Sequence, residues 1–234
     1  MSSGTLSIFF GLFGGLSLFI YGMNLMGDGL QKAAGEKMRR ILEVLTKNTF
    51  LAVLVGVVVT SILQSSSATT VLVIGFVSAR LMTLKQAIGV IMGSNIGTTI
   101  TAQLIAFDIG DYAYLIAALG FILFFCFKKK FIKYIGQTIF AFGLLFIGLN
   151  IMGDSMKPLA NNPIFVDLIT GIGRIPVLGV LTGTISTMII QSSSAFIAIL
   201  QNTASQAGPD GNALISLTTA IPILLGSNIG TTIT

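Results

Sequence analysis

The chain has 234 residues, of which 53% are hydrophobic and only 9% charged, and its mean hydropathy is +0.94. A soluble domain usually carries about a quarter charged residues, so this composition argues against a water-soluble enzyme or nucleic-acid-binding module. The formal net charge of +5 therefore concerns membrane topology. A single cysteine allows no intrachain disulfide, and the absence of histidine removes the usual proton relay and transition-metal ligand.

Four segments are apolar and have close to the roughly 20 residues that a membrane-spanning helix needs. They lie at 6–27, 86–107, 112–127 and 132–152. Residues 29–47 place apolar and basic side chains on opposite helical faces, a pattern typical of a helix in the membrane interface. The sequence therefore predicts an all-α polytopic membrane protein.

Residues 50–79 contain two apolar runs that four polar residues interrupt. They form either one long span or a re-entrant hairpin. With a hairpin, eleven of the 13 Lys and Arg residues share one side of the membrane, and only Lys157 and Arg174 lie on the other. A single crossing removes this asymmetry. The positive-inside rule therefore favours the hairpin, with a cytoplasmic basic side and the N-terminus outside.

Three sequence motifs occur twice in the same order, which indicates a duplication. Gln64–Ala68 recurs as Gln191–Ala195, Gly93–Thr99 as Gly226–Thr232, and Met26–Asp28 as Met152–Asp154. The predicted first half, 1–130, contains a span, the interfacial helix, a hairpin, a broken span and a further span. The predicted second half, 131–234, repeats this order and is expected to lack its last span.

The two halves are expected to insert in opposite orientations, because three crossings separate their starts. The second hairpin is predicted from 177–190 and 195–204. Inverted-topology repeats with broken helices are typical of secondary transporters, whose binding site lies near the middle of the membrane. The two hairpin tips are therefore expected to meet there.

Each predicted tip carries one Gln followed by three Ser, at Gln64–Ser67 and Gln191–Ser194. Hydroxyl groups, an amide and the unpaired backbone N–H groups of a starting helix suit an oxyanion. The alternative is that the serines only cap the second arm of each hairpin. Their occurrence at both symmetry-related tips favours an anion site.

The repeated Gly-Ser-Asn-Ile-Gly-Thr-Thr segment is expected to break its span, because its glycines loosen a helix. Its Asn and Thr oxygens, together with freed carbonyls, suit an alkali cation; the alternative is close helix packing through Gly93 and Gly97. No charged side chain lies near these segments or the tips, so an anion and a cation would enter together, each lowering the other's desolvation penalty. Sodium fits better than a proton, because no titratable group is present there.

The paired Gln-Ser-Ser-Ser and Gly-Ser-Asn motifs resemble those of the type II sodium-phosphate cotransporter family, including its bacterial members. The resemblance covers residues 5–234 and implies inorganic phosphate as substrate and sodium as coupling ion. For phosphate it implies Gln64, Ser65, Ser66, Ser67, Gln191, Ser192, Ser193, Ser194, Asn95 and Asn228. For sodium it implies Gln64, Ser65, Thr98, Thr99, Gln191, Ser192, Thr231 and Thr232.

The residue pattern thus predicts a cation-coupled anion transporter, and the resemblance implies a sodium-coupled phosphate uptake transporter that works by alternating access in a bacterial inner membrane. Its expected partners are phosphate, sodium and the lipid bilayer, and a homo-oligomer is compatible with the sequence. Neither a nucleic acid nor an organic cofactor is expected. The alternatives are cotransport of another oxyanion, such as a carboxylate or sulfate, and a channel or membrane scaffold. An enzyme is not expected, since the serines have neither a base nor a metal ligand to activate them.

Overall fold

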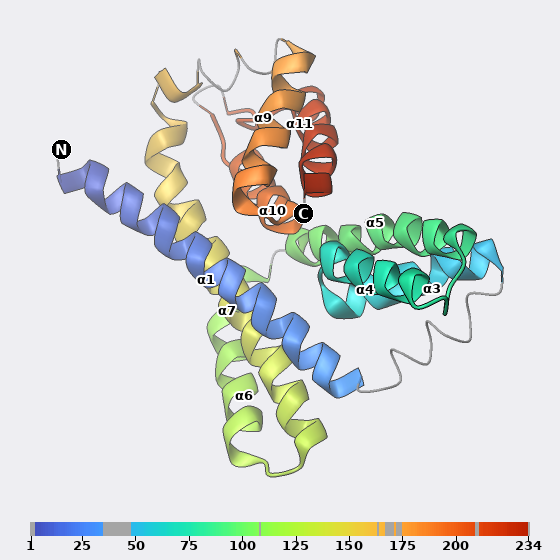
Figure 1. Ribbon diagram of the computed structural model, residues 1–234. Coiled ribbons are helices and arrows are strands. Elements are labelled where there is room, and N and C mark those ends of the chain that lie inside the picture. The colour runs from blue at the N-terminus through green and yellow to red at the C-terminus, as the bar shows by residue number, and fades with distance from the viewer. Residues whose placement is uncertain are drawn as a thin grey trace. The chain divides into compact units, whose positions relative to one another are not determined.

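The computed structural model describes residues 3–34, 48–107, 109–162, 164–166, 171, 175–208 and 211–233. Their regular structure is helical (Figure 1), which confirms the all-α prediction for this part of the chain. The elements are α1 Ser3–Ala34, α3 Thr49–Leu63, α4 Ser66–Ser78, α5 Leu84–Ala106, η1 Gly110–Tyr112, α6 Ala113–Cys126, α7 Lys130–Ala160, α9 Pro176–Ile190, α10 Ser193–Ala204, α11 Leu217–Gly230 and η2 Thr231–Ile233.

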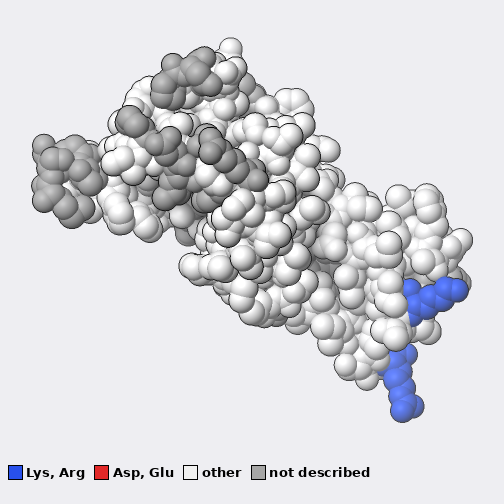
Figure 2. Space-filling view, turned by 90° about the horizontal axis from the view of Figure 1, so that it is seen from above, with Lys and Arg blue, Asp and Glu red and all other residues white. Residues whose placement is uncertain are grey.

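Three of the described helices are long and apolar enough to cross a membrane: Leu6–Ala34, Leu84–Ala106 and Lys130–Ala160. They contain nearly all of three predicted spans. The fourth, at 112–127, forms the 14-residue helix α6, which is shorter than a full crossing. Large apolar side chains are exposed along these helices, among them Phe10 at 71%. The face in Figure 2 is almost free of charge among its described residues, with a few Lys and Arg side chains near one edge.

The first helix is longer than predicted. Helix α1 continues without interruption to Ala34, so residues 29–34 belong to it and do not begin a separate interfacial helix. Within the extension, Gly29 lets α1 lie directly against the Tyr134 carbonyl and the Thr138 side chain of α7. The rest of the predicted interfacial helix, 35–47, lies outside the described residues.

The chain forms two compact units. The central unit is Tyr21–Leu145, and the terminal unit combines Met1–Ile20 with Phe146–Thr234. The boundary passes through α1 and α7, so each long helix contributes to both units. The predicted halves, 1–130 and 131–234, are defined by repeated sequence motifs, whereas the two units are defined by contacts. The halves therefore remain a prediction.

In the central unit, α3 packs closely against α5 through glycines. A Cβ atom at Gly56 would collide with the Val90 carbonyl, and one at Gly93 with the Val53 carbonyl. Helix α4 completes this group by adding Val73 to an apolar core with residues of α3 and α5. The two backbones can therefore approach only where no side chain intervenes.

In the terminal unit, α9 and α11 pack in the same way. A Cβ atom at Gly183 would collide with the Ile223 carbonyl, and one at Gly226 with the Val180 carbonyl. Phe196 and Leu200 of α10 join Ile223 of α11 in an apolar cluster. The equivalent glycines of the two repeats thus make equivalent contacts.

The predicted break in the first Gly-Ser-Asn segment is wrong. Helix α5 runs continuously from Leu84 to Ala106, through the whole motif. Gly93 and Gly97 serve close packing against α3, the alternative considered for this motif. Its threonines also stay within the helix, where Thr98 Oγ1 donates to the Ser94 carbonyl at 3.1 Å. In the second copy, α11 ends at Gly230 and a 3-10 turn follows.

Candidate substrate- and ion-binding site

The first Gln-Ser-Ser-Ser motif forms the turn between α3 and α4. Gln64 ends α3 in the left-handed region, at φ 55° and ψ 22°, and its N–H donates to the Thr60 carbonyl. Ser65 is extended and caps α4, with its hydroxyl accepting from the Ala68 N–H at 3.2 Å. The next helix therefore begins at Ser66, where α4 starts with its partial positive charge.

The second motif forms the same turn between α9 and α10. Gln191 has φ 60° and ψ 19°, and its N–H donates to the Thr187 carbonyl. Ser192 caps α10 by accepting from the Ala195 N–H at 3.2 Å. The predicted arms at 50–63, 68–79, 177–190 and 195–204 correspond closely to these four helices. The same short sequence thus produces the same local backbone twice.

Several serine hydroxyls at the two turns make no hydrogen bond to any described residue. Ser66 is half-buried, whereas Ser193 and Ser194 are buried, with exposed fractions of 6% and 8%. Ser65 and Ser192, by contrast, use their hydroxyls as caps. Because these hydroxyls have no partner among the described residues, they are available to a polar ligand.

The two glutamines turn their amide nitrogens back onto their own helices. Gln64 Nε2 donates to the Ser61 carbonyl, and Gln191 Nε2 donates to the Met188 carbonyl. Gln64 is held at its other end as well, since Thr101 Oγ1 of α5 donates to Gln64 Oε1 at 2.7 Å. The first tip is thereby joined to the helix that carries the Gly-Ser-Asn motif.

The predicted residues of the Gly-Ser-Asn motifs point mainly away from the glycine-packed helix faces. Asn95 and Thr99 are exposed, as are Asn228 and Thr232 in the second copy. Thr98 and Thr231 are partly buried. Neither asparagine has a contact with a serine turn among the described hydrogen bonds. The structure therefore joins Gln64 to α5 through Thr101 rather than through the asparagine.

Sequence reasoning missed the buried hydroxyls beneath the turns. Thr60 and Ser94 are each 1% exposed in the central unit, and Thr187 and Ser227 are 1% and 0% exposed in the terminal unit. Thr187 Oγ1 donates to Ser227 Oγ at 2.8 Å. These residues occupy equivalent positions in the two halves. Thr60 and Thr187 each stand four residues before the Gln of a turn, and Ser94 and Ser227 are the serines of the two Gly-Ser-Asn motifs. Comparison of the repeats beyond the serines would have found them.

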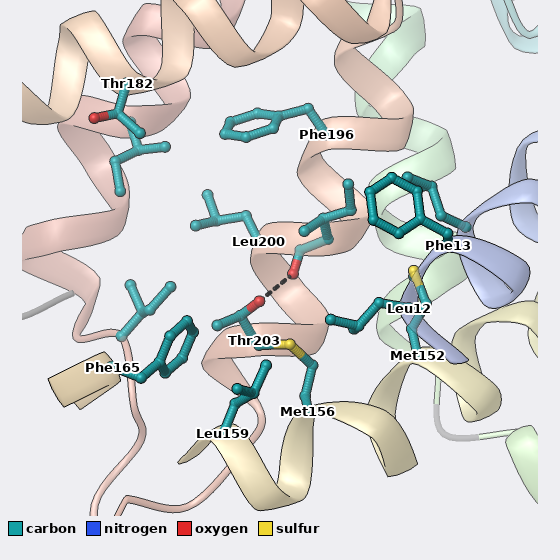
Figure 3. Close-up of a pocket in the computed structure, with 14 residues that line it drawn as sticks. Leu12, Phe13, Met152, Met156, Leu159, Phe165, Thr182, Phe196, Leu200 and Thr203 are labelled. Carbon is teal, nitrogen blue, oxygen red and sulfur yellow. Dashed lines mark hydrogen bonds between the residues drawn. The ribbon is translucent and has the colours of Figure 1, made fainter. Parts of the chain in front are cut away.

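The terminal unit also contains an apolar cavity of about 370 Å³. Figure 3 shows Phe196, Leu200 and Met152 among its lining side chains. The hydroxyls of Thr182 and Thr203 each donate to a carbonyl of their own helix, at 2.8 Å and 2.7 Å. The cavity therefore offers no free polar group for an anion and is not the candidate site.

A family model described as Na+/Pi-cotransporter matches residues 18–154 and 150–234. The uncharacterized protein YqeW of Bacillus subtilis (strain 168) is 35% identical over 92% of this chain, which covers 68% of YqeW. Escherichia coli (strain K12) YjbB, provisionally named an inorganic phosphate export protein, is 28% identical over 94% of the chain, which spans 39% of YjbB.

Human sodium-dependent phosphate transport protein 2B is 35% identical over 43% of the chain and is matched over 15% of its own length. No solved structure matches the chain. The family model nevertheless covers both serine turns and most of the described helices. The chain therefore belongs to the Na+/Pi-cotransporter family.

Proposed function

We propose that this protein is a secondary active transporter that takes up inorganic phosphate together with sodium. The observation that carries the proposal is the pair of serine-capped turns, which have matching backbone angles and no charged residue in their arms. Family membership supports phosphate and sodium as the transported ions, and two relatives have names that specify phosphate transport. YjbB is named for export, so the direction of transport requires its own test.

The proposed phosphate ligands come from both turns. Helix starts at Ser66 and Ser193 supply backbone N–H groups and a partial positive charge, and the unpaired hydroxyls can donate to phosphate oxygens. The full proposed set is Gln64, Ser65, Ser66, Ser67, Gln191, Ser192, Ser193, Ser194, Asn95 and Asn228. Phosphate would thus be held by neutral donors alone.

In this proposal, sodium supplies the positive charge that the serine turns and their helices do not contain. An anion held only by neutral groups in a poorly polar setting is costly, and a cation entering with it lowers that cost. The proposed sodium ligands are Gln64, Ser65, Thr98, Thr99, Gln191, Ser192, Thr231 and Thr232. Coupling between the two ions then follows from electrostatics rather than from a titratable side chain.

The proposed architecture has two inverted halves, 1–130 and 131–234, whose re-entrant hairpins present the serine turns from opposite sides of the membrane. Helix α3 has 15 residues and α4 has 13, so each spans only about 20 Å, less than the hydrocarbon core. A turn at this depth is tolerated where it lines a polar cavity. Alternating access would then expose the shared site to each side in turn, with the N-terminus outside a bacterial inner membrane.

Reconstituted proteoliposomes test the function directly. Purified protein should accumulate labelled phosphate when an inward sodium gradient is imposed, and uptake should saturate. Replacing sodium by potassium at equal voltage should abolish accumulation. Phosphate movement that is unaffected by sodium would overturn the coupling, and net efflux against an inward sodium gradient would show export by another mechanism.

Competition separates phosphate from the other anions. Excess unlabelled phosphate should suppress uptake, whereas equal concentrations of sulfate or a dicarboxylate should leave it nearly unchanged. If sulfate or the dicarboxylate suppressed uptake more strongly than unlabelled phosphate does, that anion would be the preferred substrate. Conductance that does not saturate would instead indicate a channel. If none of these anions crossed the membrane, a scaffold role would be the remaining alternative.

Cysteine labelling tests the hairpin. In a Cys126→Ser background, cysteines introduced one at a time at Asn48 and Leu81 flank α3 and α4. A membrane-impermeant reagent should reach both from the same side in oriented vesicles. Labelling from opposite sides would show that α3 and α4 cross the membrane once, and the inverted arrangement of the two halves would then fail.

A further inference from the structure

A cluster of three buried hydroxyls lies beneath the first serine turn, where α3, α4 and α5 meet. Thr60 is 1% exposed, Thr69 is 0% and Ser94 is 1%. Thr60 Oγ1 and Thr69 Oγ1 are 2.9 Å apart and share a hydrogen bond. Ser94 Oγ has no hydrogen-bond partner among the described residues, although it is fully buried. The cluster thus contains a buried oxygen that no described residue satisfies.

The second repeat shows where this oxygen lies. A Cβ atom at Gly97 would be 2.9 Å from Thr60 Cβ, and a Cβ atom at Gly230 would be 2.9 Å from Thr187 Cβ. The packing of the threonine-bearing helix on the glycine-bearing helix is therefore the same in both repeats. In the second, this packing places Thr187 Oγ1 at 2.8 Å from Ser227 Oγ. From the same packing we infer that Ser94 lies on the side of α5 that faces Thr60.

One substitution separates the two repeats. Thr69 stands five residues after Gln64, and the residue five after Gln191 is Phe196. Thr69 attracts the Thr60 hydroxyl and leaves Ser94 unpaired, whereas Phe196 offers no oxygen and Thr187 bonds to Ser227 instead. The first repeat therefore has three hydroxyl oxygens at these positions, and the second has a hydrogen-bonded pair and a phenylalanine.

The hydrogen atoms of the cluster can be assigned. Thr69 Oγ1 donates its single hydrogen to the Ser65 carbonyl at 3.0 Å. The hydrogen between the two threonines must therefore come from Thr60. Both threonine hydroxyl hydrogens are therefore used in hydrogen bonds. The two threonine oxygens can then only accept, through their lone pairs. Such a site attracts a cation rather than an anion.

We propose that Thr60, Thr69 and Ser94 form a sodium site that is present in the first repeat and absent from the second. Hydroxyl oxygens are hard ligands, and α3, α4 and α5 contain no carboxylate that could offset dehydration of a divalent ion. This inference rests on the proposed sodium coupling and locates one ion beneath the substrate turn. Thr69 links the ion to the turn, because its hydroxyl also holds the carbonyl of the cap residue Ser65.

Thermal unfolding of the purified full chain in detergent, without phosphate, tests the site independently of transport. The unfolding midpoint should rise with sodium at constant ionic strength, with choline as the replacement ion, and potassium should have a much smaller effect. Ser94→Ala and Thr69→Val should each raise the half-saturating sodium concentration about tenfold, the order expected for losing one contact to a charged group. Ser227→Ala, the matched control, should change it less than about twofold.

The outcomes separate a cation from a buried water and from simple packing. An unchanged half-saturating concentration in Ser94→Ala would overturn the site and leave a water as the partner of this hydroxyl. An equal effect of Ser227→Ala would overturn the asymmetry between the repeats. A wild-type chain that shows no response to sodium would also overturn the site. Sodium-driven phosphate uptake by Ser94→Ala with unchanged sodium dependence would reject this site while leaving the proposed function intact.

Discussion

The two serine turns have nearly the same backbone, and the described hydrogen bonds around them differ. Gln64 and Gln191 differ by only a few degrees in φ and ψ, and each following serine caps its helix over the same distance. Around them, Thr101 bonds to the first glutamine, whereas its equivalent in the second repeat, Thr234, lies outside the described residues; there the described bond to the neighbouring helix is from Thr187 to Ser227 of α11. The turn is therefore a local property of Gln-Ser-Ser-Ser, and its attachment depends on neighbouring helices.

The largest effect is expected where the two repeats are most alike. Gly93→Val and Gly226→Val should each destabilise the protein by about 3 kcal/mol or more, because the new side chain would collide with a backbone carbonyl that cannot move aside. Thermal unfolding in detergent measures this loss. Gly75→Ala is the control, since a Cβ placed there has no atom within 4 Å apart from the adjacent backbone of its own helix. A stable Gly93→Val protein would contradict the close packing of α3 on α5.

Removing one hydroxyl from each tip tests whether both turns bind substrate. Ser66→Ala and Ser193→Ala should each raise the phosphate concentration for half-maximal uptake about tenfold, because each removes a donor from a poorly solvated anion. Ser78→Ala, at the far end of α4, should have no such effect. If the half-maximal concentration rose in only one of the two variants, only that turn would bind phosphate. If it were unchanged in both, neither serine would be a phosphate ligand.

The attachment of the first glutamine should contribute less. Thr101→Val removes the donor to Gln64 Oε1 and should cost about 1 kcal/mol, or roughly a fivefold loss of phosphate affinity. Thr101→Ser keeps the hydroxyl and should behave much more like the wild type. If the valine and serine variants were equally impaired, packing rather than the hydrogen bond would position Gln64.

The smallest effect is expected at two exposed ion pairs formed by the corresponding residues Asp28 and Asp154. Asp28 and Lys32 lie 2.9 Å apart, and Asp154 and Lys157 lie 2.7 Å apart, with all four side chains about half exposed or more. Asp28→Asn and Asp154→Asn should each change unfolding stability by less than about 0.5 kcal/mol. A loss above about 1 kcal/mol in either would show that the pair is shielded from solvent in the membrane-bound protein.

Patterns of local origin were the most predictable from sequence. The helices α3, α4, α9 and α10 follow from apolar runs interrupted by Gln-Ser-Ser-Ser, and the structure places the helix ends at those interruptions. The same local reasoning failed for Gly93 and Gly97, whose effect on a helix depends on what packs against it. A neighbouring backbone favours a continuous α5 there, and no single segment reveals that neighbour.

Contacts between distant segments were not predictable from either segment alone. Thr101 and Gln64 are far apart in sequence, and neither position shows that the two side chains meet. Ser94 lies inside the Gly-Ser-Asn motif, but the sequence pattern predicted Asn95, Thr98 and Thr99 as its ligands. In the structure, Ser94 is buried and Asn95 is exposed.

The glycine contacts also limit how the protein can move. Since Gly56 and Gly93 seat two backbones directly against each other, α3 and α5 cannot slide past one another without a carbonyl meeting a Cα atom. The same holds for α9 and α11 through Gly183 and Gly226. Any large motion must therefore displace each helix pair as a rigid body, with the hinges in the connections around them.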